Sequence, residues 1–513
     1  MPAALDLPDD VETLKQLLLQ ERAARQADQV EIQSLKLQLA YLRRLQFGQS
    51  SEQLSQKIAQ LELALEDLEA GSSASALAME PITAREKSPR RPLPSHLPRE
   101  DVVHEPPCEQ GCTCPACGGA MKALGEDVSE VLEYIPSRFK VIRHVRPKLA
   151  CARCDKIVQA SAPSRPIARG VAGPGLLAHV LVSKYADHLP LYRQSQIFAR
   201  SGLELDRSTL ADWVGGAHQL LSPLVEALRE HVLAGTHLHA DDTPYPVLAP
   251  GTGKTKIARI WTYVRDERSW GSEVPPAVLF RYTPDRKGIH PHAHLADFAG
   301  ELHADGYAGF DRLFETGRIH ELACWAHARR KFFDLYEATR SPIAKEALDR
   351  IGALYAIESE IRGKPPDERR AVRQARAGPL LDDLHAWLVA TTRKLSKKSD
   401  AAGAIRYTLS RWQALCRYRD DGRAELDNNA AERALRCIAL GRKNHLFAGA
   451  DTGGERAAGI YSLIGTAKLN DIDPEAYLRL VLGCIAEHPI NRISELLPWS
   501  ARAKLTLQMG LAA

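Results

Sequence analysis

Two short acidic motifs contain the residues best suited to binding a divalent metal ion. The tetrapeptide LHAD occurs twice, ending once at Asp241 and once at Asp305, and both copies have the composition of a strand. Because side chains alternate along a strand, Asp241 shares a face with His239, and Asp305 with His303. A turn former or a hairpin follows each motif, so we expect both carboxylates near strand ends, where their oxygens could bind Mg²⁺. A pair of such ions about 3.5–4 Å apart can promote phosphodiester cleavage.

A third carboxylate, Glu432, lies in the segment AELDNNAAERALRCIALGRKN, which predicts a helix. Asn429 followed three residues later by a glutamate is typical of a helix start. The same carboxylate could instead pair with Arg436 one helical turn later. A metal-binding role and a purely structural role for Glu432 therefore both remain open from spacing alone.

The stretch PGTGKT resembles part of a phosphate-binding loop but does not fit the full pattern. The GxxxxGK[ST] pattern requires a glycine five residues before Gly253, and that position is Leu248. The following residues, KIARIWTYV, predict a strand rather than the required helix. We therefore predict a hairpin turn between PYPVL and KIARIWTYV, without nucleotide binding.

The cysteines predict a structural zinc site. Six of the ten cysteines lie between Cys108 and Cys154, and four of them form the pairs CPAC and CARC. Four thiolates complete a tetrahedral Zn²⁺ site without an open position, which is typical of a structural rather than a catalytic ion. Cys108 and Cys112 are alternative ligands, and a redox or buried set of thiols is the alternative interpretation. The predicted ligands are Cys114, Cys117, Cys151 and Cys154.

Composition limits the classes of partner. The formal net charge is only +4, with 44% hydrophobic and 26% charged residues, so any contact with nucleic acid must be local. No apolar run approaches the roughly 18 residues that predict a membrane span. The acidic start, MPAALDLPDD, lacks the pattern of a secretory signal. We expect a cytoplasmic protein without a membrane partner.

Basic residues cluster between the two cysteine pairs and around the acidic motifs. Such clusters can contact DNA phosphates, although each could equally be a solvated face. The candidate DNA contacts are Arg138, Lys140, Arg143, Arg146, Arg329, Arg330, Lys331, Arg436, Arg442 and Lys443.

The pattern of apolar residues and turn formers predicts an α+β multidomain chain. A leucine stripe near the N-terminus suits a coiled coil that joins two copies, with a helical hairpin as the alternative. The predicted divisions are a helical leucine-zipper-like segment (1–69), a linker (70–100), a zinc-binding domain (101–160), a helical DNA-binding or connecting region (165–235), a mixed strand–helix region (236–460) with a helical stretch at about 340–420, and a C-terminal helical domain (461–513).

Longer stretches together resemble the transposases of the insertion-sequence-sixty-six family, a bacterial group with an Asp-Asp-Glu catalytic triad. They run through almost the whole chain in the family's order. The resemblance implies an N-terminal coiled coil, a zinc ribbon, a ribonuclease-H-like α/β catalytic core with a helical insertion, and a small C-terminal helical domain. The matching stretches are FGQSSE, CPAC with CARC, LEYIPSRFKVIRHVRPKLAC, HADDTPYPVL, LHADGYAGF, CWAHARRKFFD, LDNNAAERALRCIALGRKNHLFAGADTGGERAA, TAKLNDIDPEAYL and ELLPW.

By position, the resemblance implies a catalytic triad of Asp241, Asp305 and Glu432 that holds two Mg²⁺ (or Mn²⁺) ions. The family commonly has Glu where this chain has Asp242, so which member of the Asp pair faces the metal stays open. Glu455 is an alternative third carboxylate. The large gap between Asp305 and Glu432 is best explained by a helical insertion.

The implied function is a DNA transposase. Such an enzyme binds the ends of an insertion sequence, hydrolyses a phosphodiester, and transfers the freed 3′-hydroxyl to target DNA. The implied partners are double-stranded DNA, a second copy of the chain, and companion proteins of the same element. The protein would be nucleoid-associated when bound to DNA.

Two other functions fit parts of the pattern. His237, His239 and Asp241 form a HxHxD set that could bind zinc in a metallohydrolase. A zinc-ribbon DNA-binding protein without catalysis would use the ribbon, the coiled coil and the basic helices, and its carboxylates would be structural.

Overall fold

The computed structural model describes residues 97–511, together with Leu93 and Ser95, with gaps at 106–115, 118, 136–137, 169, 250–251, 253 and 446. The predicted coiled coil, most of the predicted linker, Cys108, Cys112 and Cys114 therefore lie outside the described residues, as does the side chain of Arg138. No helix among the described residues is both long and apolar enough to traverse a membrane.

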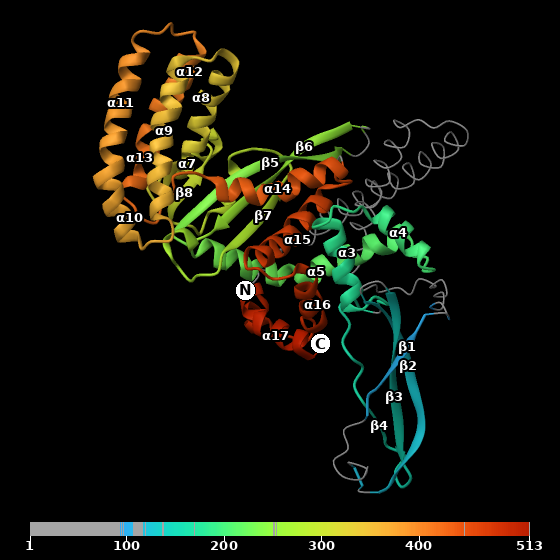
Figure 1. Cartoon of the computed structure of the whole chain (residues 1–513). Coiled ribbons are helices and arrows are strands. Elements are labelled where there is room, and N and C mark those ends of the chain that lie inside the picture. Colours follow the sequence, from blue (N-terminus) through green and yellow to red (C-terminus); the bar gives the residue numbers. More distant parts are fainter. Residues whose placement is uncertain are drawn as a thin grey trace, which may run out of the picture.

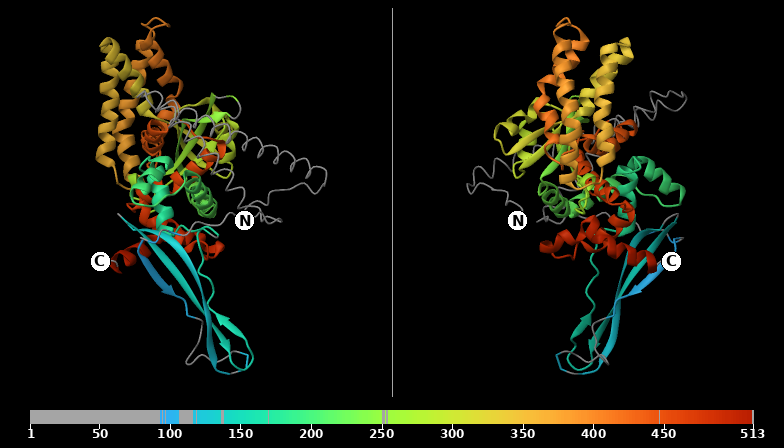
Figure 2. Two further views of the ribbon diagram at one scale, coloured as in Figure 1. Left: turned by 90° about the vertical axis from the view of Figure 1, so that its right-hand side faces the viewer. Right: turned by 60° about the vertical axis from the view of Figure 1, so that its left-hand side comes forward.

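The described chain is a mixed α/β structure with two sheets. The first is a long, narrow sheet that projects from the rest of the molecule (Figures 1 and 2). Its strands occur in the order β1-β3-β2, with β4 also paired to β3. They are β1 (Arg99–Val103), β2 (Met121–Ile135), β3 (Arg138–Cys151) and β4 (Ile157–Gln159).

Strand register in this sheet brings the two cysteine turns together. β2 and β3 are antiparallel, and Met121 at the start of β2 is opposite Cys151 at the end of β3. The turn that contains Cys117 precedes β2, and the turn that contains Cys154 follows β3. Residues far apart in the chain thus meet at one tip of the hairpin.

Three helices connect this hairpin to the second sheet. They begin beside the base of the hairpin, where Glu133 Oε1 accepts a hydrogen bond of 2.7 Å from the backbone N–H of Leu176. A carboxylate at the N-terminus of a helix stabilises its unpaired N–H groups, so this contact anchors the hairpin. The helices are α3 (Pro174–Tyr185), α4 (Leu191–Arg200) and α5 (Arg207–Leu233).

The second sheet has five strands in the order β7-β6-β5-β8-β9. β5, β6 and β7 form an antiparallel meander, β8 is parallel to β5, and β9 is parallel to β8. The predicted reversal between PYPVL and KIARIWTYV is confirmed, because Ala249 pairs with Lys254. The strands are β5 (His237–Ala249), β6 (Lys254–Arg265), β7 (Ala277–Thr283), β8 (Gly300–Ala304) and β9 (Ile319–Ala323).

Helices cover both faces of this sheet. Five consecutive residues of β6, from Ile260 to Val264, are at most 1% exposed. Since successive side chains of a strand point to opposite faces, both faces must be covered. The β-branched and aromatic composition of β6 fits such a buried strand.

Helix α15 (Asp451–Leu469) protects the edge of the sheet at β7. The Ser462 hydroxyl accepts from the N–H of Phe280 at 2.8 Å, and the Thr466 hydroxyl accepts from the N–H of Val278 at 3.1 Å. Helix hydroxyls therefore satisfy backbone groups that an edge strand would otherwise leave unpaired.

A helical bundle follows β9 and stands beside the β8–β9 end of the sheet (Figure 1). The predicted helical stretch at about 340–420 is helical in the structure, while the domain boundaries themselves remain predictions. The bundle helices are α8 (Trp325–Thr339), α9 (Pro342–Ile361), α10 (Pro366–Val372), α11 (Gly378–Thr392), α12 (Asp400–Ser410) and α13 (Trp412–Cys416).

The chain returns from the bundle to the sheet through α14 (Asn429–Asn444), which packs on β5 and β6. Ala431, Leu435 and Ile438 form its buried stripe, at the spacing that the sequence predicts. The remaining helices are the short α6 (Ile289–His294) and α7 (Asp311–Glu315), and the C-terminal α16 (Pro474–Cys484) and α17 (Pro498–Leu511).

Truncation of the buried stripe of α14 should destabilise the protein. Ile438 is fully buried, so Ile438→Ala removes apolar contacts and leaves a cavity, at a cost of about 2–5 kcal/mol. Leu440→Ala is the matched control on the same helix, because Leu440 is 44% exposed. Thermal unfolding followed by circular dichroism should show a clear fall in midpoint for the first variant only. Equal shifts would contradict the packing of α14 on the sheet.

Candidate active site

Asp241 and Asp305 lie on neighbouring parallel strands. His239 of β5 is in register with His303 of β8, and each aspartate is two residues further along its strand direction. Asp305 directly follows β8, as expected. The expectation that Asp241 lies near a strand end is wrong, because β5 continues to Ala249 as the partner of β6. The two carboxylates are nevertheless adjacent, at the point where β8 ends and β5 continues.

Two stacked histidines lie under this pair. The rings of His239 and His303 are parallel to within 7°, with centroids 4.4 Å apart, and both side chains are buried. Burial lowers the pKa of both imidazoles, so the stack is neutral near pH 7. His239 Nδ1 lies 3.1 Å from Asn428 Oδ1, directly before α14. The stack therefore also contacts Asn428, the N-cap residue of the helix that carries Glu432.

Asn428 anchors the start of α14 on the sheet. Its side-chain amide donates to the carbonyl of Ala240 at 2.8 Å, and its backbone N–H donates to Cys324 Sγ at 3.2 Å. The residue is fully buried. These contacts place the first turn of α14, with Glu432, over β5 and beside Asp241.

The environment of Asp241 raises the pKa of its carboxyl group. Burial, together with the negative charges of Asp305, Asp242 and Glu432, raises this pKa to about 7, against a lowering hydrogen bond from the Asp242 N–H. Glu432 comes from a helix more than 120 residues after β8, yet its charge acts on Asp241. The Asp241 carboxylate is therefore both desolvated and close to like charges. Bound cations would offset the cost of ionising it.

The three carboxylates do not form a compact cluster. Among the described residues, two groups of Cys, His, Asp or Glu have ligand atoms within 4.8 Å of one another, and the trio of Asp241, Asp305 and Glu432 is not one of them. Ionised carboxylates repel one another, and the ligands of a pair of ions need not all touch.

Asp242 points to the opposite face of β5 from Asp241. Its carboxylate pairs with Arg259 at 2.9 Å and with Arg286 at 2.7 Å, and its side chain is 1% exposed. Arg286 also approaches Asp305 Oδ2 at 3.7 Å and stacks on the ring of Tyr307. Asp242 is therefore engaged by two cations of the protein itself. No sequence motif marked Arg259 or Arg286.

The alternative carboxylate Glu455 lies elsewhere. It is in the first turns of α15, beside Asp451. Burial raises the pKa of Glu455, and the negative charge of Asp451 contributes to the same shift. Asp451 contacts Lys256 and Tyr282 on the β6–β7 side of the sheet. Within the described part of the chain, Glu432 forms an ion pair with His327, at 3.8 Å, rather than with Arg436.

The histidines of the HxHxD set have other partners. His237 Nε2 lies 2.7 Å from Asp421 Oδ2, and this contact lowers the pKa of Asp421, against the raising effect of burial. His239 contacts Asn428 and stacks on His303. Among the described residues, neither histidine belongs to a group with metal-ligand spacing.

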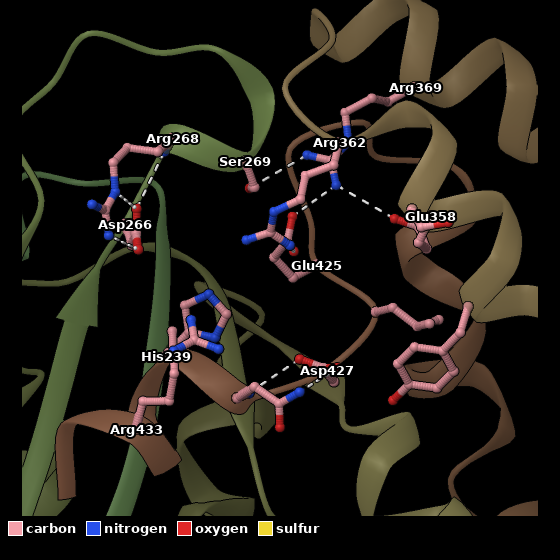
Figure 3. Close-up of a pocket in the computed structure, with 15 residues that line it drawn as sticks. His239, Asp266, Arg268, Ser269, Glu358, Arg362, Arg369, Glu425, Asp427 and Arg433 are labelled. Atoms are coloured by element: carbon pink, nitrogen blue, oxygen red, sulfur yellow. Dashed lines mark hydrogen bonds and ion pairs between the residues drawn. The ribbon is translucent and has the colours of Figure 1, made fainter. Parts of the chain in front are cut away.

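Buried arginines fasten the helical bundle to the segment before α14. Arg369, 1% exposed, pairs with Glu425 at 2.7 Å and Glu358 at 3.5 Å, and Arg373 pairs with Glu358 at 2.6 Å. Figure 3 shows Arg369 between Glu358 and Glu425, with Ser269 of the sheet region alongside. Removal of one partner of a buried ion pair costs about 3–5 kcal/mol. The bundle thus helps to fix the position of Glu432.

Three of the four predicted zinc ligands converge at the tip of the hairpin. Cys117 Sγ lies 3.4 Å from Cys151 Sγ and 3.3 Å from Cys154 Sγ. The N–H of Arg153 donates to Cys151 Sγ at 3.4 Å. A Cβ at Gly119 would lie 3.2 Å from Cys151 Sγ, so only glycine allows this approach comfortably. Three convergent sulfurs with an N–H donor fit a tetrahedral Zn²⁺ ion.

The candidate DNA-binding residues fall into two groups. Those on the hairpin pair with nearby acids: Lys140 with Glu100, Arg143 with Asp101, and Arg146 with Asp127. Arg329 and Arg330 of α8 instead line a cavity of about 680 Å³, and Glu432 is also part of its lining. Arg436 lines a separate hollow with Glu432, while Arg442 donates to the carbonyl of Pro244.

The raised pKa of Asp241 predicts a pH-dependent effect of Asp241→Asn in metal-free buffer. The folded state keeps the Asp241 proton to about pH 7 and the unfolded chain only to about pH 4, so stability falls as pH rises between these values. The variant cannot ionise. Its unfolding midpoint should therefore exceed that of the wild type by an amount that grows from pH 4 to 7 and then levels off.

Asp242→Asn is the matched control for this measurement. It removes the buried negative charge that pairs with Arg259 and Arg286, so its midpoint should fall below that of the wild type at pH 7. A constant difference between Asp241→Asn and the wild type across the pH range would contradict the assignment of the titrating group.

Comparison with known proteins places this architecture in a family. A model described as "Transposase IS66 family" matches residues 169–456, and one described as "zinc-finger binding domain of transposase IS66" matches residues 111–155. A third, "Transposase C of IS166 homeodomain", matches residues 34–102, and "IS66 C-terminal element" matches residues 462–499. The zinc-finger match, together with the convergent cysteines, supports a bound Zn²⁺ ion.

Similar full-length proteins occur in Sinorhizobium fredii (strain NBRC 101917 / NGR234). The protein named "Uncharacterized protein y4hP" is 43% identical, over 94% of this chain and 91% of the relative. "Uncharacterized protein y4jD" is 38% identical over 99% of both chains. The family match at residues 169–456 contains both LHAD motifs and α14, which supports a transposase-type enzyme acting on nucleic acid. The chain belongs to the IS66 family of transposases.

Proposed function

We propose that this protein is an Asp-Asp-Glu transposase that cleaves the ends of an insertion sequence and transfers them to target DNA. The observation that carries the proposal is the convergence of Asp241, Asp305 and Glu432 from two parallel strands and one helix. Two Mg²⁺ or Mn²⁺ ions held there would neutralise the like charges that now raise the pKa of Asp241.

The five-stranded sheet supports a ribonuclease-H-like core. A meander of three antiparallel strands continues into two parallel strands in the order β7-β6-β5-β8-β9. This topology places the central strand β5, with Asp241, next to the end of β8, with Asp305. The helical bundle between β9 and α14 is then an insertion in that core.

Each residue of the site has a separate task. Bound magnesium would polarise the phosphodiester and favour deprotonation of the attacking water or 3′-hydroxyl. Asp241 and Asp305 would hold the cations from the rigid sheet, and Glu432 would complete the site from α14. Asp242, already neutralised by Arg259 and Arg286, would stay on the other face and keep β5 in place.

Phosphate contacts should come mainly from the bundle and α14. Arg329, Arg330 and Arg436 line hollows that include Glu432, so DNA bound there would have a phosphate near the catalytic carboxylates. The hairpin arginines pair with acids and would need to exchange partners to bind DNA. We also propose Cys114 as the fourth zinc ligand, and self-association through the N-terminal segment. Companion proteins remain a prediction of the family resemblance.

A cleavage assay with DNA carrying the element ends tests the proposal. Asp241→Asn, Asp305→Asn and Glu432→Gln should each reduce Mg²⁺-dependent strand cleavage by about a thousandfold, since metal-site charge stabilisation contributes several kcal/mol to the barrier. DNA binding in a gel-shift assay should persist. Glu455→Gln is the matched control and should cleave normally, because Glu455 lies on α15 beside Asp451.

Any of three results would overturn the proposal. Unchanged cleavage by all three variants would mean that the carboxylates are structural. Activity restored by Zn²⁺ but not by Mg²⁺ or Mn²⁺ would favour the metallohydrolase alternative. DNA binding by the wild type without any cleavage would favour a non-catalytic DNA-binding protein.

A further inference from the structure

A second cluster with metal-ligand spacing lies beside Glu432. Cys324 follows β9 and is the N-cap residue of α8, and His327 is in the first turn of that helix. One ligand atom each from Cys324, His327 and Glu432 lies within 4.8 Å of the other two. His327 Nδ1 and Glu432 Oε1 are 3.8 Å apart. For comparison, ligand atoms around a tetrahedral zinc ion with bonds of about 2.0–2.3 Å are about 3.3–3.8 Å apart.

The histidine in this cluster has an unsatisfied polar atom. His327 Nδ1 is buried from solvent and has no hydrogen-bond partner among the residues that the structure describes, although the ring as a whole is partly exposed. A buried nitrogen without a partner carries a desolvation penalty. It points to a missing ligand between the imidazole and Glu432.

The sulfur of Cys324 is surrounded by hydrogen-bond donors. The N–H of Asn428 donates to Sγ at 3.2 Å, and the N–H groups of Ala326 and His327 also favour the thiolate. Burial outweighs these donors and raises the pKa of the thiol to about 12. Without a cation the sulfur is therefore protonated, and a metal ion would displace that proton to solvent.

We propose that Cys324, His327 and Glu432 bind one zinc-class divalent cation, separate from the ion of the cysteine hairpin. A donor set of sulfur, nitrogen and oxygen favours zinc over magnesium, which prefers oxygen ligands. The fourth position would face the cavity of about 680 Å³, lined by His327, Arg329 and Glu432, and would be filled by water. The three protein ligands come from two helices that meet only in the folded chain.

The ion would orient Glu432 for the proposed reaction. A carboxylate has two oxygens, so one can bind zinc while the other remains available on the side of Asp241. Only this consequence depends on the proposed function, whereas cation binding itself does not. Cys324 and His327 would then be positioning residues, because neither is proposed to contact DNA or the reacting atoms.

Zinc content of the purified full-length protein tests the site. By mass spectrometry of the metal, the wild type should carry about two zinc ions per chain, and Cys324→Ser and His327→Gln about one each. Serine at 324 remains a good N-cap residue and accepts the same N–H donors, so folding should be preserved. His327→Gln changes a partly exposed side chain and provides a second, independent variant.

Matched controls separate this site from the hairpin zinc and from catalysis. Cys416→Ser, at a half-buried cysteine outside this cluster, should keep about two ions. Asp241→Asn should also keep both while losing cleavage, so failure of the catalytic proposal is distinguishable from failure of this one. About one zinc ion in the wild type, retained in Cys324→Ser and His327→Gln, would overturn the proposal.

Discussion

The burial of Asp241 among other acidic side chains is the constraint on which the rest of the site depends. A carboxylate in a low-dielectric environment is costly to ionise, and neighbouring carboxylates increase that cost. Arg259 and Arg286 neutralise Asp242, whereas no basic residue in the described part of the chain forms an ion pair with Asp241. This difference between adjacent residues follows from strand alternation, and on it we base the proposal that cations bind on the Asp241 face of β5.

The surrounding structure holds Asp241 and Asp305 in position. The sheet fixes Asp241 and Asp305 through the pairing of β5 with β8, and the neutral stack of His239 and His303 fills the space beneath them. Asn428 links the stack to α14 and to Cys324. His239, Asn428 and Cys324 are buried and joined by these hydrogen bonds, so displacement of α14 would leave them unsatisfied.

Charge is also distributed unevenly between the bundle and the hairpin. Arg369 and Arg373 are buried and paired with Glu358, and they hold the bundle against the segment before α14. Arg329 and Arg330 line a cavity, where we propose that they contact phosphate. The hairpin arginines are largely balanced by β1 and β2 acids. The basic residues of the bundle and of the hairpin therefore have different environments, which the low net charge does not reveal.

Sequence alone determined the elements whose signals are local. The strand after PGTGKT, the helix that carries Glu432 and the paired cysteines all follow from periodicity or residue spacing within a few residues. The long matching stretches also indicated the family, which the comparisons confirm. The catalytic role of the carboxylates and the domain boundaries remain predictions.

Only the tertiary structure decided which distant groups meet. It placed Asp241 inside β5 rather than near its end, because pairing with β6 extends the strand, and it assigned Asp242 to Arg259 and Arg286. It also brought His327 to Glu432 across more than 100 residues. Such contacts depend on sheet order and helix packing, which are set by burial of the whole core rather than by neighbours in the chain.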